Sequence, residues 1–153
     1  FLDRRDFIIL FHCSSKLEQI KLRIDPNIAF NAKVLKALKR GELVGVLPDQ
    51  VPPREGGQFA PFYEQPTLTM TLISKLVQKT GAKVFCGFAK RLPEAKGYKV
   101  IVEEAALGIY KDDLDESLTA LNSTIESSIN RAVEQYQWEY TRFRKTLDGT
   151  KFY

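Results

Sequence analysis

The short apolar run from Leu43 to Leu47, which stops at Pro48, constrains the fold more than any other segment. A continuous run of this kind is typical of a parallel strand that is covered on both faces. Pro48 has no N–H to donate to a strand ladder, so we expect the strand to end there. Asp49 then stands at the carboxyl end of a buried strand, where open α/β sheets bind ligands. Pro-Asp is also common in turns, and a purely structural turn is the alternative.

The remaining segments alternate between helical and extended patterns. Apolar residues at helical spacing, ended by glycine or preceded by acidic residues, predict helices, whereas short apolar runs between Pro and Gly predict strands. The expected elements are a strand or helix end at 7–11, a helix at 31–40, a loop at 51–58, a helix at 67–80, strands at 84–89 and 98–103, and a helix at 113–138. This order predicts one mixed α/β domain over residues 1–153, with helices packed on a sheet whose other half lies upstream.

Composition excludes several classes of protein. Hydrophobic residues at 44% and charged residues at 27% are typical of a globular chain. A net charge of +4 is compatible with an acidic partner, but we see no dense basic stripe of the kind that binds nucleic acid. The longest apolar run, Phe7 to Phe11, is far shorter than the roughly 20 residues that span a bilayer. One histidine and two distant cysteines predict no metal site, and no cofactor is expected.

Several motifs follow one another in a fixed order. They are Leu35-Lys36-Ala37-Leu38-Lys39-Arg40-Gly41-Glu42, then Pro48-Asp49-Gln50, then Gly57-Gln58-Phe59-Ala60-Pro61-Phe62-Tyr63-Glu64, and finally Glu134-Gln135-Tyr136-Gln137-Trp138 with Arg142-Phe143-Arg144. As a set, over about residues 33–148, they resemble the C-terminal portion of the lipid A late acyltransferases, the lauroyl and myristoyl transferases of Gram-negative bacteria. Two features depart from the family pattern: Tyr63-Glu64 replaces Phe-Gly, and residues 1–30 match poorly.

The resemblance implies a glycerolipid-acyltransferase-like fold and transfer of a fatty acyl chain from acyl carrier protein to a hydroxyl of a lipid A precursor. It also implies a location at the membrane surface, on the cytoplasmic face of the bacterial inner membrane. Because the chain begins with Phe1, we expect it to be part of a longer protein. Two alternatives stay open: a sister enzyme acting on mannosylated phosphoinositides, and a non-catalytic α/β remnant that binds lipid or a partner.

The catalytic base is not evident in this sequence. Acyltransferases of this superfamily use a histidine as general base, with an acidic residue five positions later that orients the imidazole. The single histidine is His12, but Leu17 occupies the fifth position after it and Glu18 the sixth. We therefore expect His12 to be a packing residue and this chain alone to be inactive.

What remains resembles a substrate-binding half. The resemblance implies that Asp49 binds or orients the acceptor sugar or a neighbouring cation, and that Gln50 supports it by hydrogen bonds. Arg54 is a candidate for neutralising a phosphate on lipid A or on phosphopantetheine. The alternative for Arg54 is a solvated loop charge.

The segment that follows the loop supplies further candidates. Gly57, beside Gly56, would allow close approach of a ligand to the backbone, or would simply provide turn flexibility. Phe59 and Phe62 are candidates for lining an acyl groove, with the hydrophobic core as the alternative. The aromatic and basic tail from Trp138 to Arg144 would lie at a membrane interface or would end a helix with surface arginines.

Overall fold

A mixed four-stranded sheet forms the base of the structure, a computed structural model that describes residues 7–11 and 28–150. The strand order is β2-β1-β5-β6. Strand β1 (Phe7–Phe11) lies parallel to both β2 (Leu43–Val46) and β5 (Lys83–Arg91), and β6 (Tyr98–Glu104) runs antiparallel to β5. The mixed α/β architecture agrees with the expectation from sequence, and residues 7–11 form a strand rather than a helix end.

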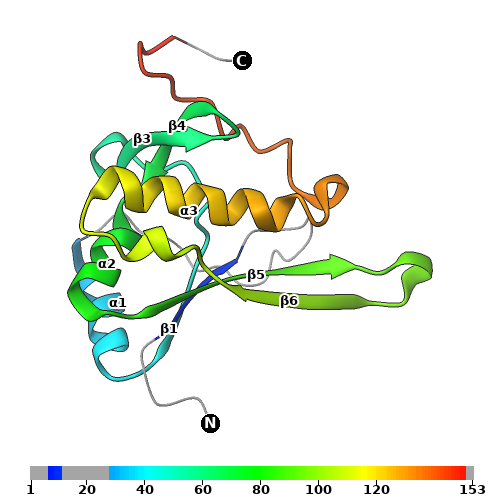
Figure 1. Cartoon of the computed structure of the whole chain (residues 1–153), viewed down its shortest axis with the longest axis horizontal. Helices are drawn as coiled ribbons and strands as arrows, with labels where there is room; N and C mark the ends of the chain where they lie inside the picture. The colour runs from blue at the N-terminus through cyan, green and yellow to red at the C-terminus, as the bar shows by residue number, and fades with distance from the viewer. Residues whose placement is uncertain (1–6, 12–27, 151–153) are drawn as a thin grey trace.

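Figure 1 shows helix α3 (Leu114–Ile129) lying between the sheet and a hairpin of β3 (Gly57–Phe62) and β4 (Gln65–Met70). Helix α3 contacts β5 on one side and the hairpin on the other. Helices α1 (Ile28–Lys39) and α2 (Leu72–Thr80) pack together beside the sheet. Short 3₁₀ segments link these elements, namely η1 (Arg54–Gly56), η2 (Pro93–Ala95), η3 (Leu107–Tyr110) and η4 (Val133–Gln135).

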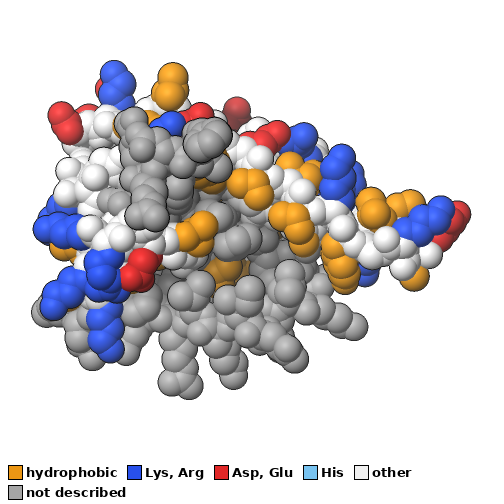
Figure 2. Space-filling view, turned by 90° about the horizontal axis from the view of Figure 1, so that it is seen from below, with side chains coloured by type: hydrophobic (Ala, Val, Ile, Leu, Met, Phe, Trp, Pro, Cys, Tyr) orange, Lys and Arg blue, Asp and Glu red, His pale blue; other side chains and the backbone are white. Residues whose placement is uncertain are grey.

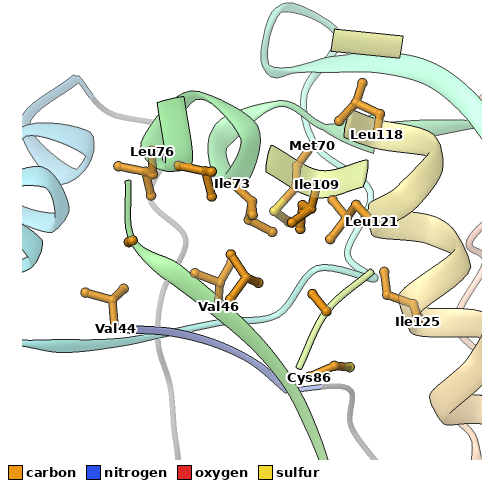
Figure 3. Close-up of a cluster of buried hydrophobic side chains, with 14 of the residues drawn as sticks. Val44, Val46, Met70, Ile73, Leu76, Cys86, Ile109, Leu118, Leu121 and Ile125 are labelled. Carbon is orange, nitrogen blue, oxygen red and sulfur yellow. The ribbon is translucent and has the colours of Figure 1, made fainter. Parts of the chain in front are cut away.

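The hydrophobic core lies where α3 meets α2 and the sheet (Figure 3). Leu118, Leu121, Ile125 and Ile129 recur at helical spacing on α3 and are fully buried. They pack in one cluster with Ile73 and Leu76 of α2, Met70 of β4, and Val84 and Cys86 of β5. Complete burial of an aliphatic side chain is worth about 1.5–3 kcal/mol, so the stripe on α3 holds the layers together.

Helix α3 begins as the sequence predicts and ends earlier. Asp113 caps it, because its carboxylate accepts a hydrogen bond of 2.9 Å from the N–H of Glu116. The predicted end at Trp138 is wrong, because the helix stops at Ile129 and Ala132 adopts the non-helical angles φ −157°, ψ 55°. Val133, expected on the buried stripe, is consequently 45% exposed.

The predicted helix over residues 67–80 is also partly wrong. Its first part is strand β4, and the helix begins only at Leu72. Pairing with β3 gives Thr67 and Thr69 a ladder partner and buries both of them completely, and this tertiary pairing overrides the apolar spacing. Gly81, with φ 68°, ends α2 as expected.

The sheet is covered less completely than the expectation for Leu43 to Leu47 implies. Burial alternates along β2, where Val44 and Val46 are buried and Leu43 is 58% exposed. The β5–β6 hairpin projects from the body of the protein, and a row of hydrophobic side chains follows it in Figure 2; Val100 of β6 is 65% exposed and Val102 49%. Within the described residues, no helix has the length and apolar character needed to cross a membrane.

The turn between β3 and β4 contains backbone strain. Phe62 pairs with Gln65, so Tyr63 and Glu64 alone form the turn, and both have positive φ angles of 46° and 63°. This is the geometry of a type I′ turn, which favours glycine and asparagine. Tyr63 is held by its contacts, since its hydroxyl donates to Asn130 Oδ1 at 2.8 Å. Glu64 is exposed and stands where the family pattern has glycine.

We predict that Glu64→Gly stabilises the chain by up to about 1 kcal/mol, because a residue without Cβ adopts a positive φ without strain. Urea denaturation followed by circular dichroism measures the change. Glu64→Ala is the matched control, since it removes the same carboxylate and keeps the Cβ, and its stability should equal that of the original chain. Equal effects of the two substitutions would show that the carboxylate, rather than the backbone angle, is responsible.

Candidate functional site

Asp49 lies just beyond the end of β2, at the edge of the sheet where the parallel strands β2, β1 and β5 present their carboxyl ends. The preceding Pro48 is buried and lies outside the strand, as expected for a residue that cannot donate to the ladder. Asp49 itself is only 8% exposed. A carboxylate in such a place needs partners, because its desolvation is unfavourable.

Two side chains from the C-terminal part of the chain influence the ionisation of Asp49. After a backbone hydrogen bond of the residue itself, the positive charge of Arg142 and the hydroxyl of Tyr136 favour the ionised carboxylate. Tyr136 is 7% exposed and Arg142 is 3% exposed. Burial outweighs these interactions and raises the pKa of Asp49 from its ordinary 3.8 to about 6. Burial also raises the pKa of Tyr136, so its hydroxyl stays protonated and able to donate.

Arg142 is fixed by contacts of its own to the hairpin. Its Nη1 donates to the carbonyl of Leu68 at 2.6 Å, and its Nη2 donates to Oγ1 of Thr69 at 3.4 Å. The guanidinium also lies over the ring of Phe62, 5.5 Å from the centroid, in a cation–π contact. Burial lowers the pKa of Arg142, whereas Tyr136 and Asp49 raise it.

A buried polar layer continues from Arg142 towards helix α3. Nδ2 of Asn122 donates to Oγ1 of Thr69 and to the carbonyl of Pro61, both at 2.9 Å. Two buried polar atoms, Asn122 Oδ1 and Arg142 Nε, have no hydrogen-bond partner among the residues that the structure describes. The carboxylate of Asp49 is therefore one end of a polar path through an otherwise apolar core.

The C-terminal segment also holds the loop that follows Asp49. The N–H of Val51 donates to the hydroxyl of Tyr140 at 2.9 Å, and Nζ of Lys145 donates to the carbonyl of Pro52 at 3.0 Å. From the loop, Nη2 of Arg54 donates to the carbonyl of Thr146 at 3.3 Å. Each bond joins residues about 90 positions apart, so the loop is shaped by tertiary contacts rather than by its own sequence.

The other residues predicted on this loop differ in exposure. Gln50 and Arg54 are exposed beside Asp49. Gly57 begins β3, and a Cβ at this position would lie 2.6 Å from Cγ of Pro52 and 3.1 Å from the carbonyl oxygen of Thr69. Tight packing against Pro52 and Thr69 is therefore a sufficient reason for glycine at this position.

The two residues predicted to line an acyl groove differ in their burial. Phe59 is half-buried on β3, whereas Phe62 is 1% exposed and belongs to the core. The ring of Phe62 packs against Tyr63 and Phe143, with centroids 5.0 and 5.9 Å apart. Phe62 therefore packs in the core, where its ring contacts Arg142. Of the two aromatic side chains, Phe59 is the one that reaches the surface.

Other candidate chemistry lies elsewhere or outside the described residues. His12, Leu17 and Glu18 fall outside them. Across residues 7–11 and 28–150, no group of His, Cys, Asp or Glu side chains is arranged to hold a metal ion. A hollow of about 270 Å³ lies between α3 and the β5–β6 hairpin, lined by Cys86, Glu103, Ser128 and neighbouring residues. None of the predicted site residues lines it.

Tyr136 and Arg142 are the site residues that the sequence did not identify. The sequence pattern places Tyr136 on the apolar stripe of a long predicted helix and Arg142 in a basic tail. The structure instead buries both, whereas Trp138 and Arg144 of the same tail are exposed, and the tail lies beyond the end of α3 rather than ending a helix. One sequence signal could have indicated both residues. The motifs that contain Tyr136 and Arg142 belong to the same ordered set as Pro48-Asp49-Gln50.

Comparison with known proteins agrees with this pairing of motifs. Residues 18–145 match the family model for bacterial lipid A biosynthesis acyltransferases. The chain is 33% identical over 115 residues to a lipid A biosynthesis palmitoleoyltransferase of Escherichia coli K12, covering 72% of this chain and 36% of that protein. It is 30% identical over 117 residues to the lipid A biosynthesis lauroyltransferase of the same organism, covering 76% of this chain and 38% of the relative.

A lipid A biosynthesis acyltransferase of Haemophilus influenzae is 29% identical over 119 residues, covering 78% of this chain and 37% of that protein. The chain thus spans less than two fifths of the length of these curated relatives. The family model, by contrast, covers most of the chain and includes every residue of the site around Asp49. The chain belongs to the bacterial lipid A biosynthesis acyltransferase family.

Proposed function

We propose that this chain forms the acceptor-binding part of a lipid A late acyltransferase. The enzyme transfers a fatty acyl chain from an acyl carrier protein thioester to a hydroxyl of a lipid A precursor. Family membership supports the reaction class, and the names of the relatives support lipid A as the pathway. The observation that supports the location of the site is the buried Asp49 at the carboxyl end of β2.

Asp49 is difficult to explain as a structural turn residue. A turn would be served equally well by a neutral side chain, whereas here burial makes the ionised carboxylate unfavourable and raises its pKa to about 6. Buried ion pairs contribute little net stability compared with well-packed apolar residues. Perturbed carboxylates of this kind are concentrated at functional sites. We infer that Asp49 is retained for its interaction with the substrate.

The geometry suggests how the acceptor would be held. The small exposed part of Asp49 accepts a hydrogen bond from a sugar hydroxyl, and exposed Gln50 adds a second polar contact beside it. Arg54, on the same loop, faces solvent and can pair with a phosphate of the acceptor. Half-buried Phe59 would contact an acyl chain. Together these residues position the acceptor without taking part in proton transfer.

The remaining features of the enzyme follow from the family. The fold of the whole enzyme is of the glycerolipid-acyltransferase type, and the general base is a histidine paired with an acidic residue five positions later, supplied by sequence other than that of the described residues. The enzyme acts at the cytoplasmic face of the inner membrane, where its acceptor lipid is located. In this arrangement the chain contributes binding and orientation, which are worth several kcal/mol of the barrier in acyl transfer.

We predict a distinctive pH dependence of stability at Asp49. Since its pKa rises from 3.8 to about 6 on folding, the folded protein binds the proton more tightly than the unfolded chain. The resulting stability is present below about pH 4 and is lost as the pH rises through about 6, amounting to about 3 kcal/mol. Asp49→Asn resembles the protonated form and should not show this loss.

The measurement is the urea-derived free energy of unfolding at intervals from pH 4 to pH 7.5. The difference between the original chain and Asp49→Asn should grow from pH 4 to about pH 6 and level off above that, since the other titrating groups cancel. Asp112→Asn, which neutralises an exposed carboxylate, is the control and should leave the profile unchanged. A difference that is constant with pH would mean that Asp49 is solvated and that the argument from burial is wrong.

We predict that Asp49→Asn in the complete gene product lowers acyl transfer by on the order of a hundredfold, because loss of a positioning group typically removes a few kcal/mol of transition-state stabilisation. The assay follows transfer from an acyl carrier protein thioester to a lipid A precursor. Thermal melts of the same preparations verify that the variant is folded. Near-normal turnover in a folded variant would show that Asp49 is a structural turn residue rather than a substrate-binding one.

We also predict that the 153-residue chain by itself has no transferase activity, because His12 is followed by Leu17 where an acidic residue is required. The chain is incubated with the same donor and acceptor, and released acyl carrier protein is measured. The control is His12→Ala. Turnover that disappears in this variant would identify His12 as the base and would refute the assignment made from spacing.

A further inference from the structure

Strand β6 forms one border of the four-stranded sheet. Among the residues that the structure describes, its outer edge pairs with no other strand. The β5–β6 hairpin carries this edge away from the body of the protein (Figure 1). The strand is seven residues long, from Tyr98 to Glu104. A long exposed edge of this kind is a template for pairing with a further strand.

The hydrogen bonds of the hairpin show which backbone groups of β6 face outward. The N–H of Leu92 donates to the carbonyl of Gly97 at 2.8 Å, and the N–H of Ala105 donates to the carbonyl of Val84 at 2.9 Å. In an antiparallel pair, every second residue bonds to the partner strand, and the residues between direct their N–H and C=O away from it. By this alternation, the residues of β6 with outward backbone groups are Tyr98, Val100, Val102 and Glu104.

The side chains of these outward residues lie on the face of the hairpin that points away from α3. The other face packs towards α3, where Oγ of Ser128 donates to Sγ of Cys86 at 3.2 Å. On the free face β5 has only alanine and glycine opposite the two valines of β6, so nothing large shelters them. A row of hydrophobic side chains is therefore exposed along the hairpin (Figure 2), namely Tyr98 at 62%, Val100 at 65% and Val102 at 49%.

A second copy of β6 fits this edge in one antiparallel register. If Ile101 lies on the two-fold axis between the copies, all seven residues of the strand find a partner. Val100 then lies opposite Val102, and Tyr98 opposite Glu104, so every outward N–H and C=O meets an outward group of the other copy. A slip by one residue would place outward groups against inward ones, and a slip by two would leave residues at the strand ends unpaired.

The charges of the strand agree with the same register. Lys99 of one copy lies opposite Glu103 of the other, and the two-fold axis repeats this pair. Opposite charges directly across two strands are stabilising, whereas like charges are destabilising. Within its own hairpin Lys99 instead stands opposite Lys90, a like-charge pair that the glutamate of a second copy would offset. A register shifted by two residues would place Lys99 opposite either Ile101 or Ala105 and would lose both ion pairs.

We propose that β6 is a self-association surface, through which two copies of this chain pair edge to edge into one continuous sheet. The occupant of the free edge is a second β6, because its backbone groups, its valines and its charges are all complementary to themselves. The valines of both copies come together on the face away from α3 and remove apolar surface from water. The pairing is independent of the role proposed for Asp49, which follows β2 at the opposite border of the sheet.

The test uses charge reversal in the 153-residue chain, with sedimentation equilibrium to measure the dissociation constant of the dimer. Lys99→Glu and Glu103→Lys each place like charges opposite one another, so each variant alone should dimerise more weakly by on the order of tenfold. An equimolar mixture of the two variants should associate as the original chain does, because in the mixed dimer each glutamate lies opposite a lysine. Lys79→Glu is the matched control, since it makes the same charge change at an exposed position of α2 and should leave the dimer intact.

Amide hydrogen exchange of the original chain gives a second measurement, which stands even if a variant does not fold. The N–H groups of Val100 and Val102 should exchange more slowly as the protein concentration rises, because they become bonded in the dimer. The N–H of Ile101 faces β5 and should show no such dependence. Circular dichroism and thermal melting establish which variants are folded.

A chain that stays monomeric at every concentration would overturn the proposal. A dimer that both charge variants leave intact would place the interface elsewhere, and folded variants whose mixture does not associate would show that these charges do not meet. If the monomeric chain instead binds vesicles of phosphatidylethanolamine and phosphatidylglycerol, and Val100→Asp abolishes this binding, the exposed face meets lipid and the proposal also fails. Absence of transferase activity would bear on the proposed function alone.

Discussion

Burial of the Asp49 carboxylate is unfavourable, and Tyr136 and Arg142 offset part of this cost. An unpaired buried carboxylate would cost several kcal/mol and would be driven either to protonation or to the surface. Its partners come from the far end of the chain, so the strand end, the hairpin and the C-terminal segment must be assembled before the charge is compensated. The site is thus a product of the whole described structure rather than of one motif.

Arg142 explains why these parts are coupled. One guanidinium contacts the carbonyl of Leu68, the hydroxyl of Thr69 and the ring of Phe62, and its charge favours the ionised form of Asp49. Its five N–H donors in a rigid plane suit it to this role, which the single ammonium of lysine could not fill in the same way. Loop, hairpin and C-terminal segment therefore share one electrostatic centre.

Helix α3 provides the frame on which this centre is built. Its apolar stripe packs towards the sheet, while Asn122 on the hairpin side donates to Pro61 and Thr69. The helix also sets the path of the C-terminal segment, because the chain leaves the helix at Ile129 and buries Tyr136 after the short segment η4.

The sequence by itself determined the local elements and the motif. Pro48 ended β2, Asp113 began α3 and Gly81 ended α2, because each of these depends on the hydrogen bonding or the allowed φ angles of a single residue. Asp49 could be selected as a candidate for the same reason. The strand identity of Thr67 to Met70, the end of α3 and the partners of Asp49 were decided only by tertiary structure. These features depend on pairing and on desolvation between residues far apart in sequence, and neither a hydrophobic period nor a local propensity contains that information.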